Sequence, residues 1–242
     1  MTSVDVSDTS RFIAKLAPYF VDTPAECPYG LDRLAVYHQA GFNFLPPAML
    51  EEFLAAGYRR NGNTIYAMRC PDCTACVPIR LATQTFLPSR NMRRVRERNQ
   101  DLDISVGPLE VTPEKLQLLD CFLNSRYPGR ASTALDYYSG FFVNSLAPSM
   151  EISFRLSGQL LGVSIVDLAE RSLSAVYFYF DPAFEKRSLG TFNILYLAEL
   201  AGREDCDYLY LGYWIEPVPA MAYKARFRPH YLLINGDWIQ VD

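Results

Sequence analysis

The chain has 242 residues, half of them hydrophobic, so it is long enough to bury a core and lacks the composition of a disordered segment. Its formal net charge is -4, and a nucleic-acid partner would therefore need a local basic face, because the field of the whole molecule does not attract phosphate. The polar N-terminus lacks the basic start and apolar run of a signal peptide, and no apolar run approaches the ~18 residues of a membrane span. We therefore expect a cytoplasmic protein, in which clustered cysteines are metal or redox ligands before they are disulfides.

The first regular elements that the sequence predicts are a helix and a hairpin. Two prolines introduce the helix over residues 48–56, and Gly57 ends it, as is usual for a C-terminal glycine. Residues 58–66 follow as a hairpin, because Asn61-Gly62 is a strong signal for a two-residue turn.

Three cysteines follow the hairpin, with two residues between neighbours: Cys70, Cys73 and Cys76. Cys27 is the candidate for a fourth ligand. Four thiolates suit zinc or an iron–sulfur cluster. The alternative is that the thiols pack against the hairpin without a metal.

A strongly basic helix is predicted after the cysteines, with Ser89 as its cap. It carries Glu97 as its one acid and five arginines: Arg90, Arg93, Arg94, Arg96 and Arg98. Arg90, Arg94 and Arg98 share one face because they are four residues apart. Arginine binds phosphate better than lysine does, so the helix is a candidate for nucleic-acid binding, with a solvated surface helix as the alternative.

The second half begins with a helix at Thr112-Pro113-Glu114 and then changes to the two-residue period of strands. The predicted order is a helix to Arg126, an antiparallel meander (152–156, 160–168, 173–180), a helix (191–202), a strand (208–214), a helical segment (221–227) and a hairpin (231–234, 238–241). This order resembles the GNAT acyltransferase fold, which is an α+β fold.

A basic turn precedes the predicted helix 191–202. In the GNAT fold, backbone N–H groups at this helix start bind the pyrophosphate of acetyl-CoA, and the close approach requires small residues. Arg187 and Gly190 fit the usual pattern, whereas Phe192 occupies its last small position. The phenylalanine argues against ordinary CoA binding and fits relatives that use a different acyl donor.

Both halves together resemble the aminoacyl-tRNA–protein transferase family, and they are most similar to its bacterial aspartate/glutamate leucyltransferases. The resemblance is carried by Tyr58 to Gly62 with Tyr66, the three cysteines with Pro78 and Arg80, Phe86 to Arg94, Asp181 to Gly190, Leu209 to Ile215, and Tyr223 to Pro229. It implies leucyl transfer from leucyl-tRNA to the N-terminal α-amine of proteins that begin with Asp or Glu, which tags them for degradation. Arginyl-tRNA, the donor of the related arginyltransferases, is the alternative.

The resemblance also implies a division of the chain and a metal. We expect an N-terminal module with the cysteine cluster and the arginine-rich helix in residues 1–105, and a GNAT-like transferase domain in residues 106–242. The arginyltransferases imply a cluster bound by a similar cysteine set, which here would be Cys27, Cys70, Cys73 and Cys76.

The chemistry of aminoacyl transfer makes modest demands on the protein. The donor ester is already activated, and a free α-amine has a pKa of ~7.7–8.0, so part of it is neutral in the cytoplasm. The enzyme must hold amine and ester together, stabilise an oxyanion and return a proton to the leaving ribose hydroxyl. No cofactor is required for these steps.

The candidate site residues follow from the motifs. The catalytic candidates are Asp181, Tyr213 and Lys224. Asp181 either positions the amine or caps a turn, and Tyr213 either shuttles a proton or belongs to the core. The candidates for substrate or tRNA binding are Arg59, Arg80, Arg90, Arg93, Arg94, Arg187, Gly190, Arg226 and Arg228. Lys224, Arg226 and Arg228 could clamp the acidic side chain of the acceptor or the tRNA end.

Two further functional classes compete with this reading. A CoA-dependent N-acetyltransferase is disfavoured by Phe192. A metal-bearing RNA-binding module without catalysis would suit the arginine helix, but it would leave the transferase half unexplained.

Overall fold

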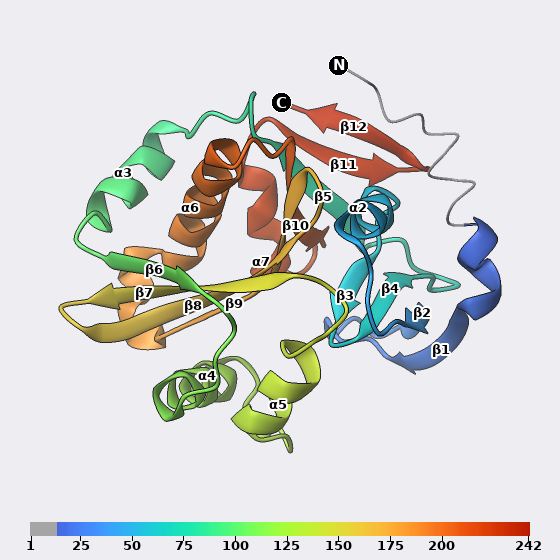
Figure 1. Ribbon diagram of the computed structural model, residues 1–242, viewed down its shortest axis with the longest axis horizontal. Helices are drawn as coiled ribbons and strands as arrows, with labels where there is room; N and C mark the ends of the chain where they lie inside the picture. The colour runs from blue at the N-terminus through green and yellow to red at the C-terminus, as the bar shows by residue number, and fades with distance from the viewer. Residues whose placement is uncertain (1–13) are drawn as a thin grey trace.

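Two sheets of unequal size organise the chain in the computed structural model, which describes residues 14–242 (Figure 1). The four-stranded sheet has the order β1-β2-β4-β3. Its strands are β1 (Val21–Glu26), β2 (Leu34–Gly41), β3 (Arg59–Asn61) and β4 (Thr64–Met68). The eight-stranded sheet has the order β12-β11-β5-β10-β9-β8-β7-β6. Its strands are β5 (Val77–Ala82), β6 (Asp103–Gly107), β7 (Ser149–Leu156), β8 (Gln159–Leu168), β9 (Ser172–Phe180), β10 (Tyr208–Trp214), β11 (His230–Ile234) and β12 (Asp237–Val241).

Helices connect and cover the two sheets. The α-helices are α2 (Pro47–Ala55), α3 (Arg90–Arg98), α4 (Pro113–Arg126), α5 (Ala134–Phe141), α6 (Leu189–Arg203) and α7 (Pro219–Ala222). The 3-10 segments are η1 (Ala17–Tyr19), η2 (Pro182–Arg187) and η3 (Tyr223–Arg226). Within residues 14–242, no helix is both long and apolar enough to cross a membrane.

The smaller sheet contains the predicted hairpin, with its turn one residue later than expected. Asn61 pairs with Thr64, so Gly62 and Asn63 form the turn. Gly62 has a φ of +54°, and a Cβ at this position would lie 2.6 Å from the carbonyl oxygen of Gly140 in α5. The hairpin therefore lies directly against α5, where a residue without a side chain is required.

The larger sheet confirms the predicted meander of β7, β8 and β9, after which α6 carries the chain to β10, parallel to β9. One face packs on α3 and α6 through a core that includes Phe154 and Phe192. The other face packs on α4 and α5 through a core that includes Val163 and Tyr179. The two pairs of helices lie on opposite sides of the sheet in Figure 1. The fold is α+β and has the element order of the GNAT fold, as the sequence predicts.

Two helix starts show how local sequence determines these elements. Thr112 accepts a hydrogen bond from the backbone N–H of Lys115, which confirms the predicted start of α4. No predicted element covers α5. Its start nevertheless carries a complete capping box, because Thr133 and Asp136 each bond the backbone of the other. The helix is short, and the Pro-Gly break before it hides this signal.

The strands of the larger sheet come from both sides of the predicted boundary at residue 105, and the division into two modules stays a prediction. β5, which the sequence analysis did not predict, pairs with β10 and β11 in the interior of the larger sheet. The predicted boundary at residue 105 falls inside β6, which is also a strand of that sheet. The smaller sheet ends at Met68, so the change from one sheet to the other lies between Met68 and Val77.

Candidate active site where strands β9 and β10 separate

The two parallel strands of the larger sheet separate toward their carboxyl ends. β9 and β10 pair only over residues 172–174 and 208–210, although both strands continue beyond the last pair. On its other edge, β10 has a bulge against β5 between Tyr210 and Tyr213, and Gly212 in this bulge has a φ of +83°. Ligands of open sheets bind outside the carboxyl ends of parallel strands, where neighbouring strands diverge. We call the region bounded by residues 175–180 and 211–214 the β9–β10 opening.

Arg59 connects the smaller sheet to this opening. Its side chain is buried, and one terminal nitrogen donates to the carbonyl oxygen of Gly212 at 2.8 Å while the other donates to that of Tyr58 at 2.8 Å. The guanidinium also lies 5.6 Å from the ring centres of both Tyr210 and Tyr213. Its Nε is buried and has no hydrogen-bond partner among the residues that the structure describes. Arg59 therefore fixes β10 to β3 and retains one free donor.

Lys224 lies close to the same glycine. Its ammonium donates to the carbonyl oxygen of Tyr213 at 2.8 Å. Burial and the nearby Arg59 lower the pKa of Lys224 to about 7. A Cβ on Gly212 would lie 3.6 Å from Lys224 Nζ and 3.9 Å from Arg59 Nε. The lysine is therefore partly neutral near pH 7 and can accept a proton, and Gly212 gives both cations access to the bulge.

Phenol side chains surround these two cations. Burial raises the pKa of Tyr66 to about 12, with Arg59, Tyr37, Cys76 and Tyr137 close enough to influence it. Burial also raises the pKa of Tyr213, and a hydrogen bond to the backbone of Met68 acts against this rise. These phenols are neutral at physiological pH. They form a weakly solvated environment in which electrostatic interactions are only weakly screened.

The predicted residues of the basic turn support the fold around η2. Asp181 Oδ1 accepts a hydrogen bond from the backbone N–H of Ala183 at 2.9 Å, so its carboxylate caps η2. Arg187 makes a bidentate pair with Asp101, with both contacts at 2.8 Å. Of the predicted catalytic residues, the structure thus brings Tyr213 and Lys224 together, and it gives Asp181 the capping role that was the alternative.

The start of α6 modifies the argument against CoA. Gly190 lies in the first turn, and a Cβ there would meet no atom of residues 14–242 within 4 Å. Phe192 is buried, with its ring 5.8 Å from that of Phe154. Because Phe192 packs into the core, its size alone does not keep a phosphate away from the helix start.

Comparison with known proteins identifies the family. Residues 25–94 match the model of the arginine-tRNA-protein transferase N terminus, and residues 114–234 match that of its C terminus. The aspartate/glutamate leucyltransferase of Aeromonas salmonicida (strain A449) is 39% identical over 207 residues, which cover 83% of this chain and 84% of that protein. The aspartate/glutamate leucyltransferase of Pseudomonas fluorescens (strain SBW25) is 35% identical over 232 residues, which cover 93% of this chain and 97% of that protein. The chain belongs to the aspartate/glutamate leucyltransferase family.

Solved structures of similar shape are more distant from this leucyltransferase. L-PGS from Bacillus licheniformis has a TM-score of 0.48 and 13% identity, over 87% of this chain and 76% of that chain. FemX has a TM-score of 0.46 and 9% identity, over 86% of this chain and 69% of that chain.

The predicted arginines of the leucyltransferase fall into two groups. Arg90, Arg93 and Arg94 are exposed on α3, as are Arg226 and Arg228 near η3. The helix is anchored beside the basic turn, because Arg98 donates to the backbone carbonyl of Lys186 and Arg187 donates to that of Arg98. The exposed arginines of α3 therefore form a basic surface in a fixed place.

Arg80 does not belong to that surface. Its side chain is buried in β5, with the guanidinium 3.6 Å from the ring centre of Tyr208 and 4.1 Å from that of Trp238. It also donates to the hydroxyl of Tyr210 at 3.1 Å. The prediction that Arg80 contacts tRNA or substrate does not fit this burial, and the residue stabilises the larger sheet instead.

The four cysteines of the predicted cluster lie near one another and are half-buried. Burial and the thiols of Cys70, Cys27 and Cys73 raise the pKa of Cys76 to about 12. Across residues 14–242, however, no group of three or more His, Cys, Asp or Glu side chains is arranged to hold a metal ion. The metal therefore stays a prediction, and no step of the reaction is assigned to it.

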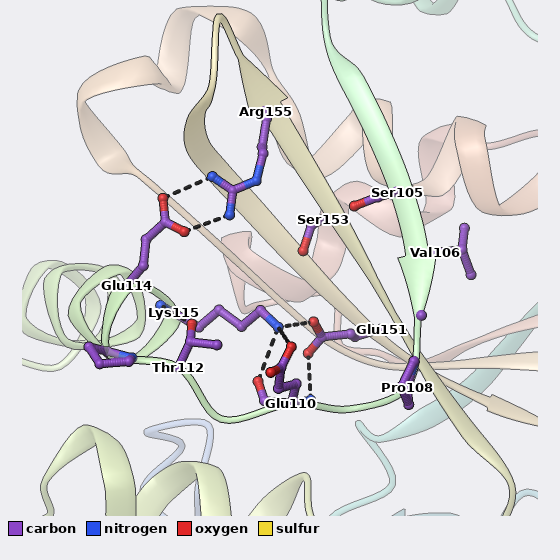
Figure 2. A pocket seen from close by; sticks show the side chains of 12 residues that line it. Ser105, Val106, Pro108, Glu110, Thr112, Glu114, Lys115, Glu151, Ser153 and Arg155 are labelled. Carbon is purple, nitrogen blue, oxygen red and sulfur yellow. Dashed lines mark hydrogen bonds and ion pairs between the residues drawn. The ribbon is translucent and has the colours of Figure 1, made fainter.

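A separate cavity of about 570 Å³ lies where β6 and β7 meet the start of α4 (Figure 2). Its charged side chains are paired with one another. The buried Lys115 contacts the carboxylate of the buried Glu151, and Arg155 pairs with both carboxylate oxygens of Glu114. Because each cation has a carboxylate partner, the arrangement stabilises the junction of helix and sheet and offers no free catalytic group.

Proposed function

We propose that this leucyltransferase transfers leucine from leucyl-tRNA to the N-terminal α-amine of proteins that begin with Asp or Glu. The observation that carries the proposal is the pair of cations at the β9–β10 opening. Lys224 is desolvated beside Arg59 without a carboxylate partner in residues 14–242, and both reach the bulge at Gly212. A base with a pKa of about 7 suits proton transfer from an α-amine.

The proposed reaction needs one proton acceptor and one oxyanion donor. The neutral α-amine of the acceptor attacks the ester carbonyl carbon of leucyl-tRNA, and the new N–C bond places a proton in excess on nitrogen. Neutral Lys224 takes this proton. The C–O bond to the ribose then breaks, and the lysine ammonium returns the proton to the ribose oxygen that leaves. The free Nε–H of Arg59 is the candidate donor to the oxyanion between these steps.

We propose that tRNA binds along the exposed face of α3. Arg90 and Arg94 lie there one turn apart, with no ion pair to a carboxylate in the described part of the chain. Contacts to phosphate release counterions, so the apparent affinity for leucyl-tRNA should fall steeply as salt increases.

The donor is tested by offering leucyl-tRNA and arginyl-tRNA separately, each with a labelled amino acid, to peptides that begin with Asp, Glu, Asn or Gln. We expect label from leucine on the acidic peptides. Arginine is the second candidate because the matched family models carry the name of arginine-tRNA-protein transferase. Transfer of arginine without leucine would replace the proposed donor, and no transfer from either would reject the proposed reaction.

We further propose that the added leucine marks the acceptor for degradation. A reporter that begins with Glu should be short-lived in cells that contain the protein and long-lived in cells without it. Equal lifetimes would contradict this role without affecting the transfer reaction.

A further inference from the structure

An enzyme that selects N-terminal Asp or Glu must distinguish a carboxylate from the amide of Asn or Gln, which has nearly the same shape. A cation with free hydrogen-bond donors makes this distinction, because it gains from the negative charge and from paired contacts to both oxygens. The inference below rests on the proposed function and concerns which residue supplies that cation.

The cations at the centre of the β9–β10 opening are already engaged. Arg59 uses both terminal nitrogens on the carbonyl oxygens of Tyr58 and Gly212. Lys224 donates to the carbonyl oxygen of Tyr213, and the proposed reaction needs it in the neutral form. Neither can present a pair of free N–H groups to a carboxylate without giving up contacts that the structure shows.

Arg126 lies on the rim of the same opening. It is the last residue of α4 and is exposed. Its guanidinium lies 5.6 Å from the ring centre of Phe122 and 5.8 Å from that of Phe180, the residue at which β9 ends. The rings hold the planar group at the carboxyl end of β9, on the side where the parallel strands have separated.

Two phenols connect Arg126 to the site electrostatically. Burial raises the pKa of Tyr223 to about 12, and Arg126 acts against this rise. Burial likewise raises the pKa of Tyr177, and Arg126 again has the opposite effect. Tyr223 directly precedes Lys224 in the chain, and Tyr177 belongs to the separated part of β9. The guanidinium therefore lies near both walls of the opening.

Arg126 also has no carboxylate partner within residues 14–242. The neighbouring Arg130, by contrast, is paired with Asp120. Among residues 14–242, no side chain or backbone group forms a hydrogen bond with the five N–H groups of Arg126, whereas Arg59 uses its terminal nitrogens on two backbone carbonyls. Arg226 is exposed as well, but no ring contact holds its guanidinium toward the opening in the part of the chain that the structure describes.

We propose that Arg126 binds the side-chain carboxylate of the acceptor's N-terminal Asp or Glu. The fork of the guanidinium would receive both carboxylate oxygens, while the α-amine of the same residue enters the opening toward Lys224. Arg126 is thus assigned as the residue that determines specificity for acidic acceptors, separate from the groups that move the proton.

The test compares wild type, Arg126→Gln and Arg126→Lys with leucyl-tRNA and peptides that begin with Glu or Gln. Arg203→Gln is the matched control, because Arg203 also ends a helix, is exposed and lies over a ring, 5.8 Å from the centre of Tyr196. We expect Arg126→Gln to lower kcat/KM for the Glu peptide by about 10- to 100-fold, the usual effect of losing a hydrogen bond to a charged group. Arg126→Lys should fall between wild type and Arg126→Gln, because it keeps the charge and loses the fork.

The ratio of kcat/KM for the two peptides separates binding of the carboxylate from a structural role. In Arg126→Gln this preference for Glu over Gln should collapse, with the KM for leucyl-tRNA unchanged, whereas Arg203→Gln should keep both values. An unchanged preference in Arg126→Gln, or equal losses with both peptides, would overturn the assignment. If wild type itself transfers leucine to no acidic peptide, the proposed function fails and not merely the role of Arg126.

Discussion

Two lysines of this leucyltransferase are desolvated, Lys115 buried and Lys224 half-buried, and their surroundings differ in one decisive respect. Lys115, at the cavity beside β6, contacts the carboxylate of Glu151 and donates to the backbone carbonyl of Glu110 at 3.1 Å (Figure 2). Lys224, at the β9–β10 opening, has a backbone carbonyl and a second cation, Arg59, for neighbours. Burial alone therefore does not indicate function. A buried lysine with a carboxylate stabilises the fold, whereas one without a carboxylate becomes a base.

The largest expected effect is on catalysis at the unpaired lysine. Lys224→Met should lower the rate of leucyl transfer by about a hundred- to ten-thousand-fold, which is the usual contribution of a general base. The free energy of unfolding near neutral pH should not fall, because the substitution removes a desolvated charge that lacks a partner. Single-turnover transfer and denaturant unfolding measure the two quantities. A variant with nearly wild-type rate would show that Lys224 is not the base.

The paired lysine should give the reverse result. Lys115→Met leaves Glu151 buried without its cation, and removal of one partner of a buried pair costs about 3–5 kcal/mol of unfolding free energy. The folded fraction should keep its transfer rate, because the cavity beside β6 has no assigned role in the reaction. The double variant Lys115→Met/Glu151→Leu is the control, since it removes both charges and should recover much of the loss. If the double variant is as unstable as the single one, the ion pair is not the cause.

Much of the larger sheet could be predicted from local sequence. The two-residue period between residues 152 and 180 predicts the meander, and the cap at Thr112 predicts the start of α4. β5 escaped prediction for a physical reason. Pro78 lacks a backbone donor and normally argues against an interior strand. In this fold Pro78 stands opposite Tyr213, next to the bulge, where the ladder is already interrupted.

The candidate site was predictable in its residues and not in its geometry. Motifs indicated Tyr213 and Lys224, but the contact between Arg59 and Gly212 joins residues 153 positions apart, and no local pattern reports it. Arg80 likewise shows that local sequence does not report contacts between distant strands. Its place in the cysteine motif made it a candidate for substrate or tRNA binding, while the rings of Tyr208 and Trp238 that bury it come from distant strands.

The pH dependence of transfer should reveal the unusual lysine. Both Lys224, with a pKa of about 7, and the acceptor amine, with a pKa of ~7.7–8.0, must be neutral for attack. Below about pH 7 both groups are protonated, so the logarithm of kcat/KM should rise with pH with a slope approaching two. Just above pH 7 only the amine is still protonated, and the slope should fall to one. Lys224→Met should lose the steeper segment. If the pH profile of wild-type kcat/KM shows only the inflection of the acceptor amine, the pKa of Lys224 is not lowered.

The lowered pKa of Lys224 also makes the free energy of unfolding depend on pH. Folding lowers the pKa of Lys224 from 10.5 to about 7, so the folded state disfavours the charged lysine. This destabilising contribution is complete below about pH 7 and disappears as the pH rises toward 10.5. Relative to Lys224→Met, wild type should thus gain unfolding free energy as the solution becomes more alkaline. A difference that does not change with pH would show that folding leaves the lysine unperturbed.

The smallest expected effect concerns the glycine between the two cations. Gly212→Ala places a side chain at a φ of +83°, which costs about 1–2 kcal/mol of unfolding free energy. It also adds a Cβ 3.6 Å from Lys224 Nζ and 3.9 Å from Arg59 Nε, so the transfer rate should fall as well. Gly158→Ala is the matched control, because Gly158 has a φ of +89° and open space around its Cβ position. The two variants should lose similar stability while only Gly212→Ala loses activity. Equal activity in both would mean that access to the bulge does not limit transfer, and it would weaken the distinction between the catalytic lysine and the structural one.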